Sequence, residues 1–437
     1  MIRISYHLNL PIMLRGLTST TLRRSVQHTM VSSRGLASAS RAGQMWSETA
    51  LSLSNPLSGT VGLDEEQVMF YETAAAAASD VLAPFAAEWD EKEVFPVETL
   101  KGFADLGFGA IYTSDEHGGT GASRLDAALV FEALSMGCPS TTAYLSIHNM
   151  CTWMVDTFGS DELRGDFVPA LASMDKLSSY CLTEPGSGSD AAALRTTAVA
   201  DGDDYILNGE KAFISGGGET DLYVIMARTG DKGPGGISCF LVEDGSDGLS
   251  YGSKLDKLGW NSSPTRPVVL QDVRVPARHM LGNPGEGFKI AMKGLDGGRI
   301  NIGACSIGAA AAAVDFARGH VQERTAFGKP LSAFQNTEFK FADMATKLRA
   351  SRLIIREAAS LLDQKSPLAT STAAMAKRLA SDHGFDVIND SLQMLGGYGY
   401  TREYPIERYL RDARVHQILE GTNEIQLLII ARALFQS

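Results

Sequence analysis

The run Asp204-Tyr205-Ile206-Leu207-Asn208-Gly209 lies near the middle of the chain and ends in a dipeptide typical of a β-hairpin turn. Short runs rich in β-branched and aromatic residues follow at 222–227, 236–242 and 267–275, separated by turn residues. The pattern of a long helix does not occur between these runs. This spacing therefore favours an antiparallel sandwich or barrel over a parallel sheet, and we assign residues 176–283 to a β-domain.

Helical periodicity occupies the chain on both sides of the β-domain. In residues 60–175, apolar side chains recur every three or four positions, which predicts an N-terminal helical domain. In residues 284–437 the same pattern predicts a C-terminal four-helix bundle. Its helices are expected at 288–323, 337–362 and 368–395, with a last one after Tyr404. The predicted fold is mainly α with a central β-domain.

The composition describes an ordinary soluble globular protein, with 44% hydrophobic and 21% charged residues in 437. The net charge of −12 argues against a nucleic-acid partner. A run of 18 apolar residues does not occur, so we expect no membrane span. The five cysteines lack a CxxC pair and the histidines lack an HxxxH pair, so we expect reduced thiols and no metal site.

Residues 1–47 differ in charge from the rest of the chain. They contain six arginines and many hydroxyl residues, and the first acidic residue is Glu48. This composition predicts a mitochondrial transit peptide and a protein of the mitochondrial matrix. A disordered basic tail with another role is the alternative interpretation.

A carboxylate in an apolar setting occurs near the C-terminus, in Gln417-Ile418-Leu419-Glu420-Gly421-Thr422-Asn423-Glu424. Apolar neighbours disfavour the charged form of Glu420 and raise its pKa towards neutrality, which suits a general base. Gly421 lets the backbone come close to a ligand. The alternative is a surface charge or a glutamate at a helix N-terminus.

Three further motifs each have two interpretations. Hydroxyls and glycines in Tyr180-Cys181-Leu182-Thr183-Glu184-Pro185-Gly186-Ser187-Gly188-Ser189-Asp190 can hold a phosphate or heterocycle, or form a plain turn. A dinucleotide fingerprint at these glycines is rejected, because a βαβ unit does not follow. Arg324 can pair with phosphate or with a helix dipole. The glycines of 396–400 permit ligand approach or end a helix.

In combination and in this order, these motifs resemble the acyl-CoA dehydrogenase family from about residue 60 to the end of the chain. Four further stretches, 146–151, 257–262, 297–302 and 414–421, are similar to members that act on short branched acyl-CoA. The resemblance implies a homotetrameric flavoenzyme that passes electrons to an electron-transferring flavoprotein. Its FAD would lie between the β-domain and the C-terminal bundle, with some residues reaching across a subunit boundary.

The resemblance also implies a set of site residues. Those that bind the cofactor would be Tyr180, Cys181, Leu182, Thr183, Gly188, Ser189, Phe213, Ile214, Ser215, Arg324, Phe334, Gln335, Gln393, Met394, Leu395, Gly396, Gly397, Thr422, Asn423 and Glu424. Those that bind the substrate would be Ser189, Asp296, Gly297, Gly298, Arg299, Gly421 and Arg432.

Glu420 would be the catalytic base by the same resemblance. It would take the α-proton of the thioester while the β-hydrogen leaves as hydride to flavin N5. Some members carry the base at the position of Gly298, which cannot act as one. Leu419 stands where several straight-chain members have tyrosine, and this difference bears on the acyl pocket. Isobutyryl, 2-methylbutyryl and butyryl thioesters stay open as substrates, since one methylene changes discrimination by only about 1–3 kcal/mol. An acyl-CoA oxidase and a weakly catalytic flavoprotein assembly factor are the other functions considered.

Overall fold

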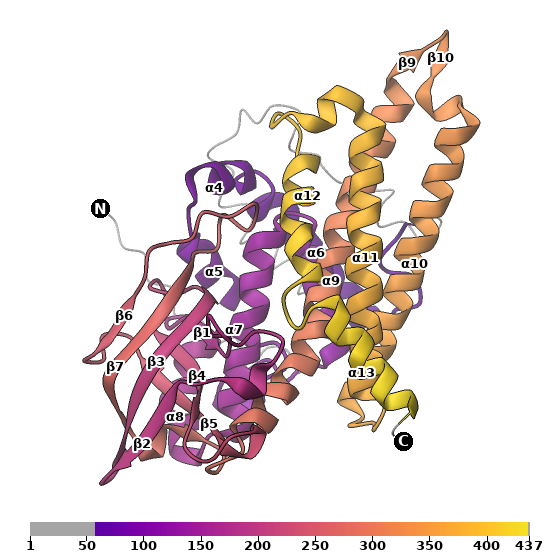
Figure 1. Ribbon diagram of the computed structural model, residues 1–437. Coiled ribbons are helices and arrows are strands. Elements are labelled where there is room, and N and C mark those ends of the chain that lie inside the picture. Colours follow the sequence, from indigo (N-terminus) through magenta and orange to yellow (C-terminus); the bar gives the residue numbers. More distant parts are fainter. Residues whose placement is uncertain (1–56, 436–437) are drawn as a thin grey trace. The chain divides into compact units, whose positions relative to one another are not determined.

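The computed structural model describes residues 57–435, so the predicted transit peptide at 1–47 lies outside the described residues. Helices come first along the chain, then strands, then helices again (Figure 1). This order agrees with the predicted fold class of a central β-domain between two helical domains. The change from helix to strand falls between Ala172 and Ser178, and the change back falls between Leu281 and Gly287.

Three of the N-terminal helices begin at a residue whose side chain accepts a hydrogen bond from a free backbone N–H group: Asp64, Ser123 and Ser160. The Asp64 side chain accepts a hydrogen bond from the Gln67 N–H, and the Asp64 N–H donates one to the Gln67 side chain; Ser123 and Asp126 form the same reciprocal cap. Pro139 occupies the first turn of the longest of these helices. The helices are α3 (Glu65–Ala77), α4 (Ala86–Lys92), α5 (Val97–Ala104), α6 (Arg124–Ser135), α7 (Pro139–Phe158) and α8 (Asp161–Ala172), with a π-helical turn at Ala78–Leu82.

The β-domain is one eight-stranded sheet with the order β6-β7-β3-β2-β4-β5-β8, and β1 pairs with β4. Most neighbouring strands are antiparallel, as predicted, but β4 pairs in parallel with both β1 and β2. The β2–β3 hairpin provides the long connection that a parallel pair needs. The strands are β1 (Ser178–Cys181), β2 (Thr197–Asp201), β3 (Asp204–Ser215), β4 (Leu222–Arg228), β5 (Ile237–Glu243), β6 (Leu249–Tyr251), β7 (Thr265–Pro276) and β8 (Met280–Leu281).

Alternate side chains of β4 enter two different cores, because successive residues of a strand point to opposite faces. Leu222, Val224 and Met226 pack with residues of α7, α8 and α9. Tyr223 and Ile225 pack with β3, β5 and β7 inside the β-domain. The strand is therefore buried on both faces and fixes the β-domain against the helices.

The predicted hairpin turn at Asn208-Gly209 is wrong. Both residues lie inside β3, where the pairing with β7 shifts register next to Gly209. The β2–β3 turn lies earlier, at Gly202, where φ is +64°. A Cβ atom on Gly209 would lie 2.7 Å from the Thr196 Cα, so the glycine permits close approach of two backbones. The dipeptide thus marks a β-bulge.

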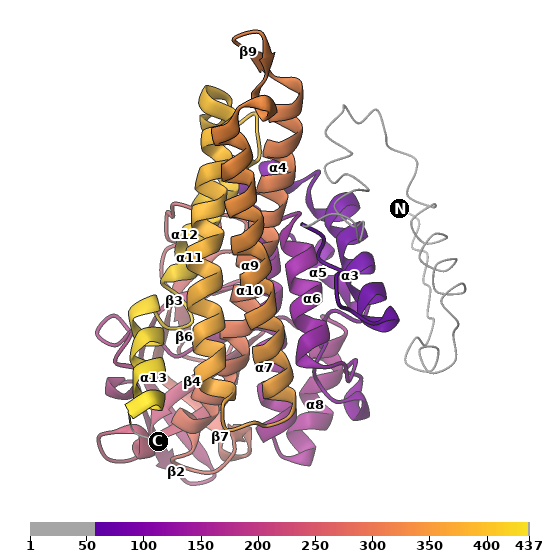
Figure 2. The same ribbon diagram turned by 90° about the vertical axis from the view of Figure 1, so that its right-hand side faces the viewer.

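The C-terminal helices α9 (Gly287–Glu323), α10 (Gln335–Asp363) and α11 (Ala369–Leu395) run side by side (Figure 2). The last predicted helix is two helices, α12 (Ile406–Arg414) and α13 (Asn423–Phe435), which both pack on α11. A short ribbon of β9 (Thr325–Ala326) and β10 (Lys329–Pro330) joins α9 to α10.

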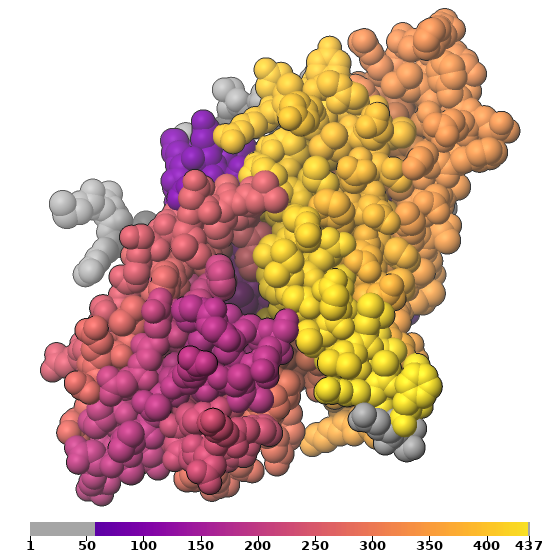
Figure 3. Space-filling model, viewed as in Figure 1, coloured from indigo at the N-terminus to yellow at the C-terminus, as the bar shows by residue number. Residues whose placement is uncertain are grey.

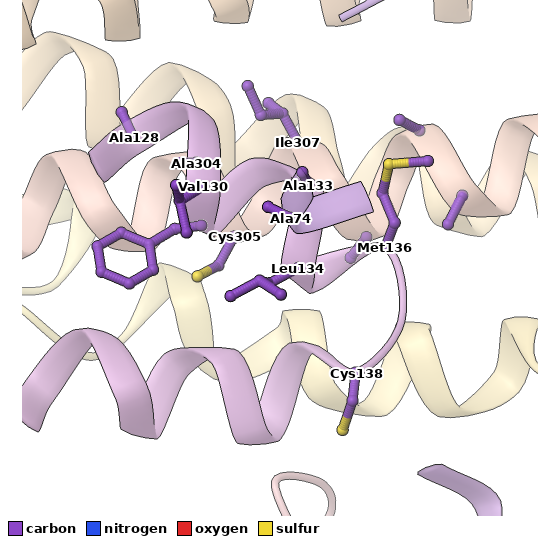
Figure 4. Packing of buried hydrophobic residues seen from close by; sticks show 14 of the residues in the cluster. Ala74, Ala128, Val130, Ala133, Leu134, Met136, Cys138, Ala304, Cys305 and Ile307 are labelled. Carbon is purple, nitrogen blue, oxygen red and sulfur yellow. The ribbon is translucent and has the colours of Figure 1, made fainter. Parts of the chain in front are cut away.

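Helix α9 is the central helix of the described residues and packs against α6, α7, α10 and α11. By length and composition it could cross a membrane, but 89% of its most apolar stretch is buried inside the protein. Small side chains bring α6 and α9 together, including Ala133 and Ala304 (Figure 4). A Cβ atom on Gly308 would lie 2.0 Å from the Glu132 carbonyl oxygen. The position of α9 is therefore closely fixed, and the site depends on it.

Replacement of Arg352 by methionine should strongly destabilise the fold. Its Nε donates to Glu132 Oε1 at 2.7 Å, and both side chains are buried between α10 and α6. Loss of one partner leaves a buried charge unpaired, which costs about 3–5 kcal/mol. Thermal melting should show a large fall for Arg352→Met and almost none for Arg274→Met, whose ion pairs are exposed. Equal melting temperatures for the two variants would contradict the assignment of the buried pair.

Candidate active site

A cavity of about 1260 Å³ lies between the β-domain and the C-terminal helices. Figure 3 shows the hollow between the magenta and the yellow parts of the chain. Its walls come from the loop after β1, the end of β3, the loop before β7, α9, and the segment from α12 to α13. Of the residues predicted for the site, it brings together Tyr180, Leu182, Thr183, Gly188, Ser189, Phe213, Ile214, Ser215, Arg299, Glu420, Gly421, Thr422 and Arg432.

Glu420 lies in the turn between α12 and α13 and has a left-handed backbone, with φ at +56°. Its Oε2 atom is buried and has no hydrogen-bond partner among the described residues. Burial raises the pKa of the carboxyl to about 7, although the positive charges of Arg299 and Lys377 lower it. A carboxyl with this pKa can exist as the base at neutral pH and can keep the proton it takes.

Gly298 on α9 provides the space for this carboxylate. A Cβ atom at residue 298 would lie 2.4 Å from Glu420 Oε2 and 2.8 Å from its Cδ. Any side chain there would therefore displace the carboxyl group from its position. The two positions considered for the base lie against each other, and here only Glu420 can occupy the shared space.

The loop after β1 is held in place by a buried ion pair. Lys211 Nζ donates to Glu184 Oε1 at 2.8 Å and to the Leu182 carbonyl at 3.1 Å. The Glu184 carboxylate also accepts hydrogen bonds from the backbone N–H groups of Arg195 and Thr196. These contacts fix the loop that places the Thr183 and Ser189 residues at the cavity wall.

The cavity wall suits a large planar aromatic ligand with a polar chain. The Phe213 side chain is 68% exposed although it lines a cavity, so a flat apolar face is open to a ligand. Hydroxyl residues Thr183, Ser189 and Ser215 line the same cavity. An aromatic ring beside several hydroxyl donors fits an isoalloxazine with its ribityl and phosphate groups.

Three residues of the cavity wall other than glycine have positive φ: Phe213, Trp260 and Glu420. Such a conformation costs about 1–3 kcal/mol per residue and is common at functional sites. Trp260 is held by its N–H, which donates to Asp412 Oδ1 at 2.6 Å, and by its indole N–H, which donates to His416 Nε2 at 3.3 Å. Prediction from the sequence did not assign Trp260 to the site.

The predicted substrate residues on α9 face in different directions. Arg299 lines the cavity and its Nη1 donates to Asp296 Oδ1 at 2.6 Å. Gly297 instead faces Arg124, whose Nη1 would lie 2.2 Å from a Cβ atom at 297. The Arg124 guanidinium lies 3.6 Å from the centre of the Tyr112 ring. Arg124 was missed because an arginine at the start of an amphipathic helix reads as a surface residue.

A second group of predicted cofactor residues does not reach the cavity. Arg324 lies roughly 39 Å along α9 from Gly298, at about 1.5 Å per residue. Its guanidinium lies 6.0 Å from the ring centre of Tyr398, just after α11. This far end of the bundle is at the β9–β10 ribbon in Figure 1. The residues that lie away from the cavity of their own chain are Arg324, Phe334, Gln335, Gln393, Met394, Leu395, Gly396 and Gly397.

Three other predicted cofactor residues do not direct side chains into the cavity. Cys181 is buried in the core of the β-domain. Asn423 is buried and donates to Ser381 Oγ at 3.0 Å and to Asp382 Oδ1 at 2.7 Å. Glu424 is exposed at the start of α13. Only their backbones, or a second chain, can bring them to a ligand.

Lys377 on α11 was also missed. Its side chain is fully buried, and its Nζ donates to the Gly421 carbonyl at 2.9 Å and to Asn423 Oδ1 at 2.8 Å. The sequence carries a signal for it, because Lys377 interrupts a row of small apolar residues at helical spacing, which includes Ala373, Ala376 and Ala380. A lysine in such a row needs a buried partner.

The chain belongs to the acyl-CoA dehydrogenase family. The models of its N-terminal, middle and C-terminal domains match residues 64–175, 179–273 and 285–435. The protein is therefore an FAD-dependent acyl-CoA dehydrogenase, and relatives at 54–55% identity indicate a short-chain acyl-CoA as its substrate. The resemblance, the enzyme class and the cofactor predicted from the sequence are confirmed.

Individual relatives are similar over most of their length. Mitochondrial isobutyryl-CoA dehydrogenase of Bos taurus is 54% identical over 377 residues, which are 86% of this chain and 91% of the relative. The solved structure of butyryl-CoA dehydrogenase from Megasphaera elsdenii is 40% identical, with a TM-score of 0.83 over 85% of this chain and 99% of that one. PigA with FAD and proline is 31% identical, with a TM-score of 0.83 over 86% of this chain and 98% of that one.

Proposed function

We propose that this protein oxidises isobutyryl-CoA to methacrylyl-CoA in valine degradation, in the mitochondrial matrix, and passes the electrons to an electron-transferring flavoprotein. The observation that carries the proposal is the Glu420 carboxylate, which faces an apolar cavity with one oxygen unpaired and its pKa near 7. The identity of 54% with a mitochondrial isobutyryl-CoA dehydrogenase supports the choice of substrate and compartment.

In the proposed reaction Glu420 removes the proton from the α-carbon of the thioester. FAD, when bound, supplies the acceptor for the β-hydrogen, which leaves with its electron pair, so that a carbon–carbon double bond forms. The charge that develops on the thioester oxygen needs a donor. Within residues 57–435 the Glu420 N–H donates to no protein acceptor, so it is available for this oxygen.

The acyl end of the cavity is apolar. Ile147 of α7, Leu295 and Ile302 of α9, and Leu419 beside the base all line it. Such walls exclude water from the reacting carbons and strengthen the electrostatic contacts of the base. Leucine at 419, in place of the tyrosine of several straight-chain members, leaves a wall without a polar atom beside a short branched chain.

The remaining cofactor residues are proposed to act in a homotetramer. Since Arg324 and the glycines at 396 and 397 lie far from the cavity of their own chain, they would contact FAD bound in a neighbouring subunit. Arg324 is exposed at the end of α9, and the neighbouring Phe327 side chain is 96% exposed. An arginine and an open aromatic ring are suited to a pyrophosphate and an adenine.

The proposed substrate is tested by a panel of short acyl-CoAs with an artificial electron acceptor. The highest kcat/KM is expected for isobutyryl-CoA. A preference for butyryl-CoA or 2-methylbutyryl-CoA would overturn the proposed substrate and leave the enzyme class unchanged. Rapid peroxide formation in air would instead indicate an oxidase, and negligible turnover of every acyl-CoA by FAD-loaded protein would favour an assembly factor.

A further inference from the structure

The turn that contains Glu420 is held by a buried lysine, Lys377 of α11. Glu420 and Gly421 are consecutive residues with positive φ, at +56° and +84°. Lys377 Nζ donates to the Gly421 carbonyl at 2.9 Å, and Gln426 Nε2 donates to the same oxygen at 2.7 Å and to the Glu420 carbonyl at 3.1 Å. The backbone of the turn is therefore fixed by two side chains that do not line the cavity.

Hydrogen bonds connect Lys377 to both ends of the segment 417–423, which contains the turn. Besides Gly421, it donates to Asn423 Oδ1 at 2.8 Å, and the Asn423 amide donates in turn to Asp382 Oδ1 at 2.7 Å. Gln417, before the turn, also donates to Asp382 Oδ1 at 2.9 Å. The start of the segment, its turn and the first residue of α13 thus share one hydrogen-bond network on α11.

We propose that Lys377 is a positioning residue for the dehydrogenation, because it fixes the Glu420 turn through the Gly421 carbonyl and favours the ionised carboxylate by its charge. The proposal rests on the proposed role of Glu420 as the base. Lys377 itself does not line the cavity, so it acts through the turn.

The charges around Lys377 agree with this role. Those that act on it are Glu420 in the turn, Asp382 on α11, Arg299 on α9 and Glu424 on α13. Burial lowers the pKa of Lys377 to about 8, and the carboxylates oppose this change. The lysine is therefore still largely cationic at neutral pH, where it lowers the pKa of Glu420.

The test compares the pH dependence of kcat/KM in Lys377→Met, Lys377→Arg and wild type. On the acid side of the profile, kcat/KM falls as Glu420 becomes protonated, and we call this part the acid limb. In Lys377→Met the acid limb should move to a pH about one unit higher, because the carboxylate loses a nearby positive charge. At pH 6.5, kcat/KM should consequently fall about tenfold. Lys377→Arg keeps the charge and should restore the limb to near its wild-type position. Lys340→Met, which removes a partly exposed lysine from α10, is the control and should leave the profile unchanged.

An acid limb at the wild-type pH in FAD-loaded Lys377→Met would overturn the proposal. If Lys377→Met does not fold, the acid limb of Lys377→Gln is measured instead, since the glutamine amide keeps a hydrogen-bond donor and lacks the charge. An acid limb at the wild-type pH in that variant would also overturn the proposal. Failure of the proposed function gives a different result, because the wild-type enzyme would then turn over none of the acyl-CoAs, or Glu420→Gln would remain active.

Discussion

Glu420→Gln should reduce turnover at neutral pH by about 10²–10⁴-fold and leave FAD bound. Glutamine has nearly the same shape and fits the space beside Gly298, but its amide cannot accept the α-proton. The measurements are kcat with isobutyryl-CoA and the visible flavin absorbance of the purified protein. Glu357→Gln, which changes an exposed carboxylate on α10, should keep full activity.

The same variant should show a pH-dependent gain in stability. Burial raises the pKa of Glu420 to about 7 in the folded protein, above its ordinary value of 4.5. The wild-type protein therefore loses stability as the pH rises from about 4.5 to about 7, because the carboxyl ionises in the unfolded chain but stays protonated in the fold. Glu420→Gln avoids this loss, so its melting temperature should exceed that of wild type at pH 8. The difference should shrink as the pH falls towards 4.5, and a constant difference would contradict the raised pKa.

Retained turnover in Glu420→Gln would refute the assignment of the base. The structure offers few substitutes, because the space at residue 298 is already filled by the Glu420 carboxyl group. Asp296 on the same helix is paired with Arg299 and also accepts a hydrogen bond from Thr370 at 2.7 Å. Its carboxylate is therefore engaged on both oxygens.

Periodicity in the sequence predicts the long helices well, since each has an apolar stripe, and a glycine directly follows α7 and α11. It failed where the backbone departs from a regular element without a change in hydrophobicity. Residues 415–422 separate α12 from α13 without a proline, and the chain turns there at Glu420 and Gly421, which have positive φ. Asn208-Gly209 looks like a hairpin turn, although contact with Thr196 makes it a bulge.

Buried charged residues were also difficult to predict from the sequence, because their partners lie far away along the chain. The sequence around Lys377 does not identify its partners, which lie 44 and 46 residues further along the chain. The sequence around Arg124 likewise does not show that this residue packs against Gly297 of α9. Contact across such distances depends on how α9 and α11 pack. The sequence motif at Glu420, by contrast, is local, because the proposed base and its glycine are adjacent residues. The proposed base can thus be found in the sequence, whereas the residues that support it are found only in the structure.

Co-expression of Glu420→Gln and Arg324→Ala chains should restore activity that neither variant has alone. In the proposed tetramer each site combines the cavity of one subunit with the Arg324 end of a neighbour. A mixed pair then contains one doubly damaged site and one intact site, because the Arg324→Ala chain supplies Glu420 and the Glu420→Gln chain supplies Arg324. Random pairing should therefore give about a quarter of wild-type turnover per chain, since two-fold symmetry places two sites in each pair.

The geometry of α9 makes this experiment decisive. Roughly 39 Å of rigid helix separates Gly298 from Arg324, so a single chain cannot bring both to one FAD without unfolding its central helix. If Arg324 interacts only with the dipole at the C-terminal end of α9, Arg324→Ala should keep both flavin and activity. The mixture would then have only the activity of its Arg324→Ala chains. Loss of flavin from Arg324→Ala alone, together with recovery in the mixture, is expected only when the cofactor site is shared between subunits.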